Sequence, residues 1–234
     1  MEGKAYLYRV FNFAPLFDHI HPYPPYIPDT ATKLIVGTLP PPRFTTGQLK
    51  AGDVDFCYGS RDGQLWVILD RLFDLHLRFE NTVEAVEQRE RFLKRRGIGI
   101  CDMIASAKRE KIDATDIGMR QVELRDLIAI LGRHPKVNTL LFTGGNSKNG
   151  PEYFFRRHLK TYSLKLELTV DKVPRIHTFQ HPKDGRLIKT VTLTAPSGSA
   201  NRAVGSMAAF KTLRAKNPAF TAVDFRVIQY KPFF

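Results

Sequence analysis

Three short runs of consecutive apolar residues lie in the chain, each ending at a glycine or a polar residue. They occupy positions 33–37, 98–102 and 137–145, and a fourth segment rich in β-branched residues occupies 189–194. A continuous apolar run is typical of a strand that is buried on both faces, as in a parallel sheet. The four segments therefore predict four strands of such a sheet.

Between these strands, apolar residues recur at helical spacing. Residues 64–75 carry Leu65, Ile68, Leu69, Leu72 and Phe73 on one stripe. A second helix is expected over 82–96, where acidic residues precede basic ones and Gly97 ends the helix. We expect further helices over 122–131, around 153–158 and over 203–213.

Strands that alternate with helices predict an α/β fold. We expect a three-layer α/β/α arrangement with a mainly parallel central sheet of about four strands. The 234 residues, 43% of them hydrophobic, suffice for one large core or at most two small ones. No internal repeat, low-complexity tract or linker is present, so residues 1–234 are expected to form a single domain.

The first 30 residues are expected to form an extended arm packed on this domain. Prolines crowd positions 19–28, where they remove hydrogen-bond donors and exclude a helix or a central strand. His19 and His21 lie in this arm. No cluster of partner ligands accompanies them, so we interpret them as ordinary loop histidines rather than metal ligands.

The charge balance indicates a polyanionic partner. The formal net charge is +13, which favours nucleic acid, although a basic surface that only maintains solubility stays open. The sequence shows neither a membrane-spanning apolar run nor a signal peptide pattern, so a cytoplasmic location is expected, nucleoid-associated in a bacterial cell. Cys57 and Cys101 sit beside apolar residues and are expected to be buried free thiols.

Polar or small residues follow each predicted strand. They are 37–40, Asp102, 143–145 and 196–199. Because the carboxyl ends of parallel strands meet at one edge of a sheet, we expect a ligand site there. The spacing excludes a P-loop, a dinucleotide fingerprint and a nucleophile elbow. The loop Ser197-Gly198-Ser199 is interpreted either as a phosphate-binding loop or as an ordinary turn.

The segment 55–66 combines aromatic residues, a glycine, a cation and carboxylates directly before a predicted helix. This composition suits a pocket for a flat ligand. Asp62 either faces that pocket or caps the helix. Asp102 is expected at the pocket floor or as a helix cap, and Trp66 is expected in the core.

Together these segments resemble the uracil-DNA glycosylase superfamily, in particular the branch that includes hypoxanthine-DNA glycosylases. The resemblance spans most of the chain and is carried by short pieces in a specific order: 34–40, 56–59 with Trp66, 97–104 with Arg109 and Asp113, 142–144 and 196–201. It implies the predicted sheet and an enzyme that flips a damaged base out of the duplex and cleaves its bond to deoxyribose.

The resemblance also implies roles for individual residues. Tyr58 is expected to stack on the flipped base, Asp102 to read the edge of that base, and Leu39 and Pro40 to contribute the pocket wall. The loop 196–202 is expected to bind DNA phosphates and to enter the gap. Its candidate residues are Ser197, Ser199, Asn201 and Arg202.

The chain departs from the family pattern at three positions that carry catalytic side chains in relatives: Leu39, Gly63 and Ala195. Asp62, beside Gly63, is the remaining candidate. Its carboxylate would stabilise positive charge on the sugar and orient water, with help from backbone groups at Thr38.

The resulting expectation is a monomeric DNA glycosylase that excises a deaminated base, uracil or hypoxanthine, without a metal or organic cofactor. Two alternatives stay open. One is a nucleic-acid-binding homologue without catalytic activity, and the other is a hydrolase of free nucleosides.

Overall fold

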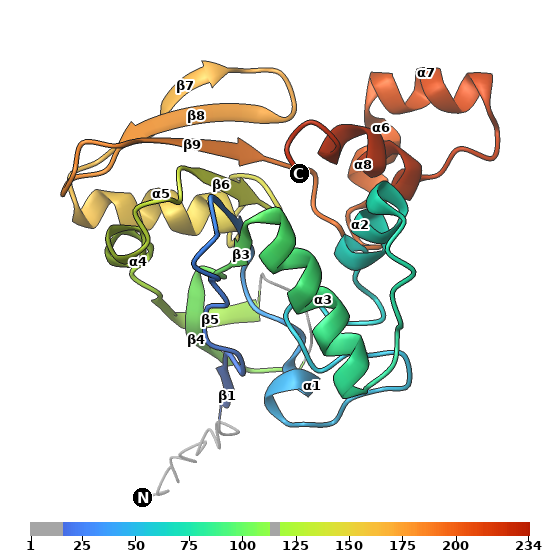
Figure 1. Ribbon diagram of the computed structural model, residues 1–234, viewed down its shortest axis with the longest axis horizontal. Helices are drawn as coiled ribbons and strands as arrows, with labels where there is room; N and C mark the ends of the chain where they lie inside the picture. The colour runs from blue at the N-terminus through green and yellow to red at the C-terminus, as the bar shows by residue number, and fades with distance from the viewer. Residues whose placement is uncertain (1–15, 113–117) are drawn as a thin grey trace, which may run out of the picture.

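The computed structural model describes residues 16–112 and 118–234. Its larger sheet has six strands (Figure 1). In spatial order they are β3 (Ile98–Ile100), β2 (Lys33–Val36), β6 (Thr139–Phe142), β9 (Leu187–Thr192), β8 (Arg175–Gln180) and β7 (Glu167–Val170). The first four run parallel to their neighbours, whereas β8 and β7 are antiparallel additions.

The four predicted strands thus correspond to the four parallel strands of this sheet. The expected number of about four strands was too small, because the sheet has six. The missed pair β7–β8 lies at one edge. All four residues of β7 are exposed, including Leu168 and Val170. An exposed edge strand needs no continuous apolar run, so the pattern that identified the buried strands could not identify this one.

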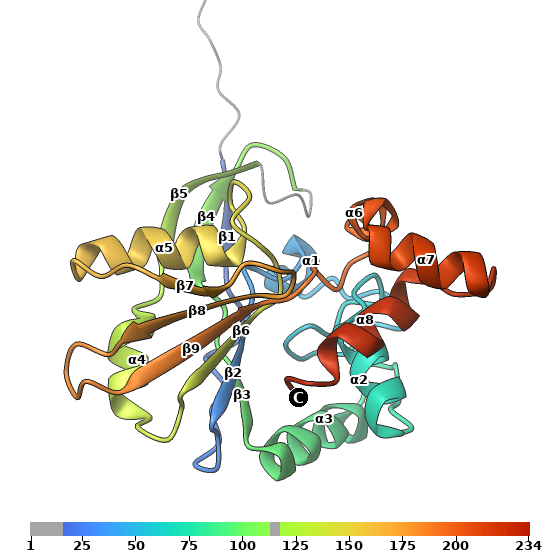
Figure 2. The same ribbon diagram turned by 90° about the horizontal axis from the view of Figure 1, so that it is seen from above.

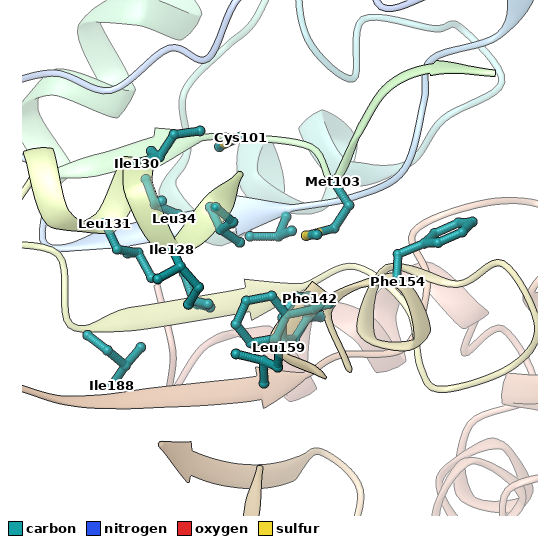
Figure 3. Packing of buried hydrophobic residues seen from close by; sticks show 14 of the residues in the cluster. Leu34, Cys101, Met103, Ile128, Ile130, Leu131, Phe142, Phe154, Leu159 and Ile188 are labelled. Atoms are coloured by element: carbon teal, nitrogen blue, oxygen red, sulfur yellow. The ribbon is translucent and has the colours of Figure 1, made fainter. Parts of the chain in front are cut away.

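Apolar residues of the central strands alternate between two cores, one on each face of the sheet. Leu34 and Phe142 pack against α4 (Leu127–Arg133) and α5 (Pro151–Thr161), as Figure 3 shows. Ile35 and Leu141 face the opposite way, toward α2 (Leu65–Phe73), α3 (Val83–Arg96) and α8 (Ala222–Tyr230). The sheet is therefore covered by helices on both faces (Figure 2).

A second sheet has three antiparallel strands in the order β1 (Phe17–Ile20), β4 (Ile104–Arg109) and β5 (Met119–Leu124). The expected extended arm contains one strand, β1, which lies at the edge of this sheet and pairs with β4. The prolines of positions 19–28 all follow this strand, so they leave its ladder intact. Residues 1–15 of the expected arm, and Asp113, lie outside the described residues.

His19 lies in β1 rather than in the expected loop, whereas His21 lies in the loop that follows, and both side chains are buried. His19 Nδ1 accepts a hydrogen bond of 2.7 Å from Nε of Arg109. Burial and the nearby Arg109 charge lower the pKa of His19 to about 4. Pairing with β4 places these histidines inside the molecule, which local sequence alone does not reveal.

The helix expected over 122–131 is instead the end of β5 followed by α4. Asp126 separates the two, since its Oδ1 accepts a 2.9 Å hydrogen bond from the Ala129 backbone and so caps α4. The apolar residues of β5 and α4 fall at helical spacing by coincidence, and the pairing of β5 with β4 decides the conformation.

The helix expected over 203–213 is two helices, α6 (Asn201–Ser206) and α7 (Ala208–Lys216), because the backbone at Met207 is extended. The helix over 82–96 is confirmed as α3, which Thr82 caps and Gly97 ends with a φ of 60°. The short α1 (Pro42–Thr45) and α8 were not expected; with them the described residues contain eight helices.

Candidate functional site

A pocket of about 280 Å³ lies where the four parallel strands end. Eight of the ten predicted site residues line it: Thr38, Leu39, Pro40, Tyr58, Asp62, Asp102, Ser197 and Ser199. Thr143 and Ala195, which follow β6 and β9, complete the wall. The strand ends therefore meet as parallel pairing requires.

Asp102 lies at the floor of this pocket, buried among hydrogen-bond donors. Its Oδ1 accepts from the Gly37 backbone N–H at 2.8 Å and from the Tyr58 hydroxyl at 2.9 Å. Its Oδ2 lies 3.1 Å from His21 Nε2. Asp102 is followed by β4 rather than by a helix, so the helix-cap interpretation was wrong.

The hydrogen bonds assign the proton of His21. The Tyr23 backbone N–H donates to His21 Nδ1 at 3.1 Å, and a nitrogen that accepts carries no proton. His21 is therefore neutral with its proton on Nε2, from which it donates to Asp102. Sequence reasoning missed this contact because 81 positions separate the two residues.

Tyr58 has a strained backbone that fixes its side chain. Its φ of 59° lies in the left-handed region, which bulky residues rarely adopt and which costs of order 1–3 kcal/mol. The Trp66 indole N–H donates to the Cys57 carbonyl at 2.9 Å and so holds the preceding peptide unit. Trp66 is buried in the core, as expected.

The Tyr58 hydroxyl contacts residues that follow two of the parallel strands, β3 and β6. It donates to Asp102 and lies 3.2 Å from Thr143 Oγ1. Burial and the Asp102 charge raise its pKa well above 10, so the phenol stays protonated. A Cβ on Gly37 would collide with this hydroxyl and lie 2.8 Å from Asp102 Oδ1, so the close approach requires glycine there.

Asp62 lies at the rim, and 67% of its side chain is exposed. Its Oδ2 accepts from Arg43 Nη2 at 3.1 Å. The helix that follows begins after Gln64 without any side-chain cap, so the interpretation of Asp62 as a helix cap was wrong. Of the two carboxylates that line the pocket, Asp62 is the one that reaches solvent.

Asp53, which sequence reasoning missed, holds the loop that carries Asp62. Its buried carboxylate accepts from Arg43 Nε at 2.7 Å, from Arg43 Nη2 at 2.8 Å and from the backbone of Lys50 and Arg61 at 2.8 Å each. Burial raises its pKa, but the hydrogen bonds of Arg43 and of the backbone outweigh burial and lower the pKa to about 2. An ionised Asp53 thus fixes Arg43, which contacts Asp62.

The loop 196–199 is attached to the segment before α2. The Gln64 N–H donates to the Pro196 carbonyl at 2.8 Å, and Gly63 pairs with Ser197 in an isolated bridge. The Ser197 and Ser199 hydroxyl oxygens lie 3.0 Å apart at the pocket wall. Both serines therefore line the same pocket as Asp62 and Tyr58.

Arg226 of α8 holds this loop by hydrogen bonds. It is fully buried, and its Nη1 donates to Gln64 Oε1 and Asn201 Oδ1 at 2.7 Å each, while Nη2 donates to the Ser197 carbonyl at 3.3 Å. Burial lowers its pKa. Its position among the apolar residues of a helix is the sequence signal that could have identified Arg226 as a buried residue.

The remaining predicted residues lie outside the pocket lining. Asn201 begins α6 and holds Arg226. The Arg202 side chain is exposed, and within residues 16–112 and 118–234 it makes no hydrogen bond or ion pair. A second hollow of about 380 Å³ adjoins the pocket and shares Thr38, Thr143 and Ala195 with it.

The cysteines are buried free thiols, as expected. Burial raises the pKa of Cys101 to about 12 and also raises that of Cys57, so neither is a thiolate nucleophile. In the described part of the chain, no group of three or more His, Cys, Asp or Glu side chains is placed to hold a metal ion. No helix of that part is long and apolar enough to cross a membrane.

Comparison with protein-family models, curated proteins and solved structures finds no match to this chain. The geometry of the pocket and the residues that line it are therefore the basis for assigning a function.

Proposed function

We propose that this protein is a DNA glycosylase that excises a deaminated base, uracil or hypoxanthine. One observation carries the proposal: the segments that resemble the superfamily, which are distant in sequence, line a single pocket. The pocket has room for one flipped base. The net charge of +13 supports DNA rather than a free nucleoside as the substrate.

The proposed fold is the three-layer arrangement of that superfamily, with β3, β2, β6 and β9 as its central sheet. Parallel pairing of these four strands and the helices on both faces support it. The pair β7–β8 and the three-stranded sheet are then additions at the edges of the common core.

Base recognition is assigned to the floor of the pocket. Tyr58, whose hydroxyl is held by two partners, offers a fixed aromatic ring to the flipped base, and Leu39 and Pro40 line the wall. Asp102 Oδ2 accepts one hydrogen bond from the described residues, that of His21 Nε2, and retains a lone pair. That lone pair suits the ring N–H that uracil and hypoxanthine both present.

In the proposed reaction, the bond between the base nitrogen and C1′ of deoxyribose breaks, and its electron pair leaves with the base. Positive charge develops on the sugar, where the Asp62 carboxylate stabilises it. Asp62 and the backbone at Thr38 orient a water molecule whose oxygen bonds to C1′. The proton of that water goes to the departing base, which leaves a free base and an abasic site.

DNA binding is assigned to the loop 196–202. The Ser197 and Ser199 hydroxyls and the exposed Arg202 contact phosphates, while Asn201 contributes through its bond to Arg226. These contacts carry no sequence information, which suits an enzyme that searches DNA for a damaged base.

The test is single-turnover excision from duplexes that carry uracil, hypoxanthine or xanthine opposite defined partners. We expect excision of at least one of these bases, and a rate about 100-fold lower in Asp62→Asn. Asp74→Asn is the matched control, because Asp74 is also exposed and lies outside the pocket. An unchanged rate in Asp62→Asn would remove the catalytic role of Asp62.

The alternative of a binding protein without catalysis also has specific support. Leu39, Gly63 and Ala195 line the pocket without polar side chains, and Asp62 is already paired with Arg43. Tight binding to damaged duplexes with no excision of any base would favour this alternative. Cleavage of free nucleosides without DNA binding would favour a nucleoside hydrolase.

A further inference from the structure

A larger hollow lies along α5, apart from the candidate pocket. It has a volume of about 880 Å³ and is lined by α5, by Asn146 and by residues 163–166. It shares no lining residue with the pocket at the strand ends. Helix α5 and helix α7 lie at opposite sides of the molecule in both views (Figures 1 and 2). We call this hollow the α5 groove.

The α5 groove combines an apolar floor with a cationic rim. Its floor consists of Tyr153, Leu159, Leu164 and Leu166. Its four cations are Arg156, Arg157, Lys160 and Lys165. No aspartate or glutamate lines it.

Most of this positive charge is not neutralised. Arg156 pairs with the buried Glu152. Among residues 16–112 and 118–234, the Arg157 side chain donates to the Val122 carbonyl alone, and it lies over the Phe154 ring at 5.2 Å from its centroid. The side chains of Lys160 and Lys165 are exposed and make no hydrogen bond or ion pair within the described ranges. An acidic group entering the groove would therefore meet three cations without carboxylate partners.

From these residues we infer that the α5 groove binds a segment of a partner protein in which acidic residues flank leucine or phenylalanine side chains. Acidic residues of the partner would complement the cations of the rim. Its leucine or phenylalanine side chains would pack on the apolar floor. A nucleic acid strand fits less well, because binding of bases needs aromatic rings to stack on and the floor offers only Tyr153.

The adjacent edge strand strengthens this inference. β7 continues directly from Leu166 and is the last strand of its sheet, so one side of its backbone has no strand partner in the described residues. Leu168, which belongs to β7, is 56% exposed. Exposed apolar side chains on a free strand edge are typical of a surface that pairs with another chain.

The test uses a fluorescent peptide in which aspartates alternate with leucine and phenylalanine, and measures its binding by anisotropy. The groove variant is Lys160→Glu with Lys165→Glu. The control is Lys211→Glu with Lys216→Glu, which changes the net charge equally at exposed positions of α7. We expect about tenfold weaker binding in the groove variant and less than twofold in the control.

Three outcomes would overturn the inference. Equal losses in both variants would indicate an unspecific charge effect. Equal binding of a peptide with serine in place of leucine and phenylalanine would exclude a role for the apolar floor. A loss of binding to a single-stranded oligonucleotide, but not to the peptide, would identify a nucleic acid surface. Circular dichroism of each variant checks that the fold is retained.

Discussion

Asp102 at the floor and Asp62 at the rim belong to one pocket but differ in exposure and in partners. The Asp102 side chain is 7% exposed and accepts from three donors, whereas that of Asp62 is 67% exposed and contacts Arg43. A buried carboxylate with several donors holds structure together, and an exposed one is available to a ligand. The floor therefore fixes geometry, and the rim offers reactive groups.

Asp102→Ala is the substitution with the largest expected effect. It leaves the Gly37 N–H and His21 Nε2–H without an acceptor inside the protein, and it leaves the Tyr58 hydroxyl with Thr143 Oγ1 as its one partner among the described residues. We expect a loss of about 4 kcal/mol in the free energy of unfolding. Urea denaturation measures it, and a loss below about 1 kcal/mol would contradict a structural role of the floor.

Asp53→Asn comes next, with an expected loss of about 3 kcal/mol near pH 7, because Arg43 loses its buried partner. The folded-state pKa of Asp53 is about 2, below the ordinary 3.8. Its ionisation therefore stabilises the fold above pH 3.8, and this contribution is lost as the pH falls through 2. The stability difference between the two proteins should narrow over that window in urea titrations. A difference that is constant with pH would argue against an ionised Asp53.

Gly37→Ala tests the contact between the floor and Tyr58. The added methyl group meets the Tyr58 hydroxyl and Asp102 Oδ1, so we expect a loss of about 2 kcal/mol. Tyr58→Phe removes one of these contacts, and Gly37→Ala should cost about 1 kcal/mol less in that background. A double-mutant cycle from urea denaturation gives this coupling. Additive losses would mean that the two residues do not contact each other.

Asp62→Asn is expected to have the smallest effect on stability, within about 0.5 kcal/mol, since the ion pair with Arg43 is exposed. Excision should nevertheless decrease, as proposed above. Thermal unfolding of this variant beside Asp102→Ala compares rim and floor directly. A large destabilisation by Asp62→Asn would remove the distinction between them.

The sequence predicted those parts of the fold that depend on local pattern. The buried runs identified the four parallel strands, and capping residues identified α3. The edge strands β1 and β7 escaped prediction because few of their residues are buried and the neighbouring strand sets their conformation. β5 was assigned to a helix for the same reason, since pairing with β4 overrides its spacing.

The site was predicted in part. Eight of ten residues line the pocket, because parallel strands bring their carboxyl ends together whatever the rest of the chain does. His21, Asp53 and Arg226 were missed. Each acts through contacts with residues far away in the chain, such as the bond between Arg226 and Gln64 across 162 positions. No local pattern encodes those partners.

By itself, the sequence determined the alternation of strands and helices and thereby the edge at which polar residues gather. Only the tertiary structure decided which of those residues are buried and which are exposed. Asp102 and Asp62 are the same residue type in the sequence. Burial shields Asp102 from solvent, so its oxygens accept hydrogen bonds from Gly37, Tyr58 and His21 instead. The Asp62 side chain stays 67% exposed, and this exposure is what our proposal of a catalytic role for it requires.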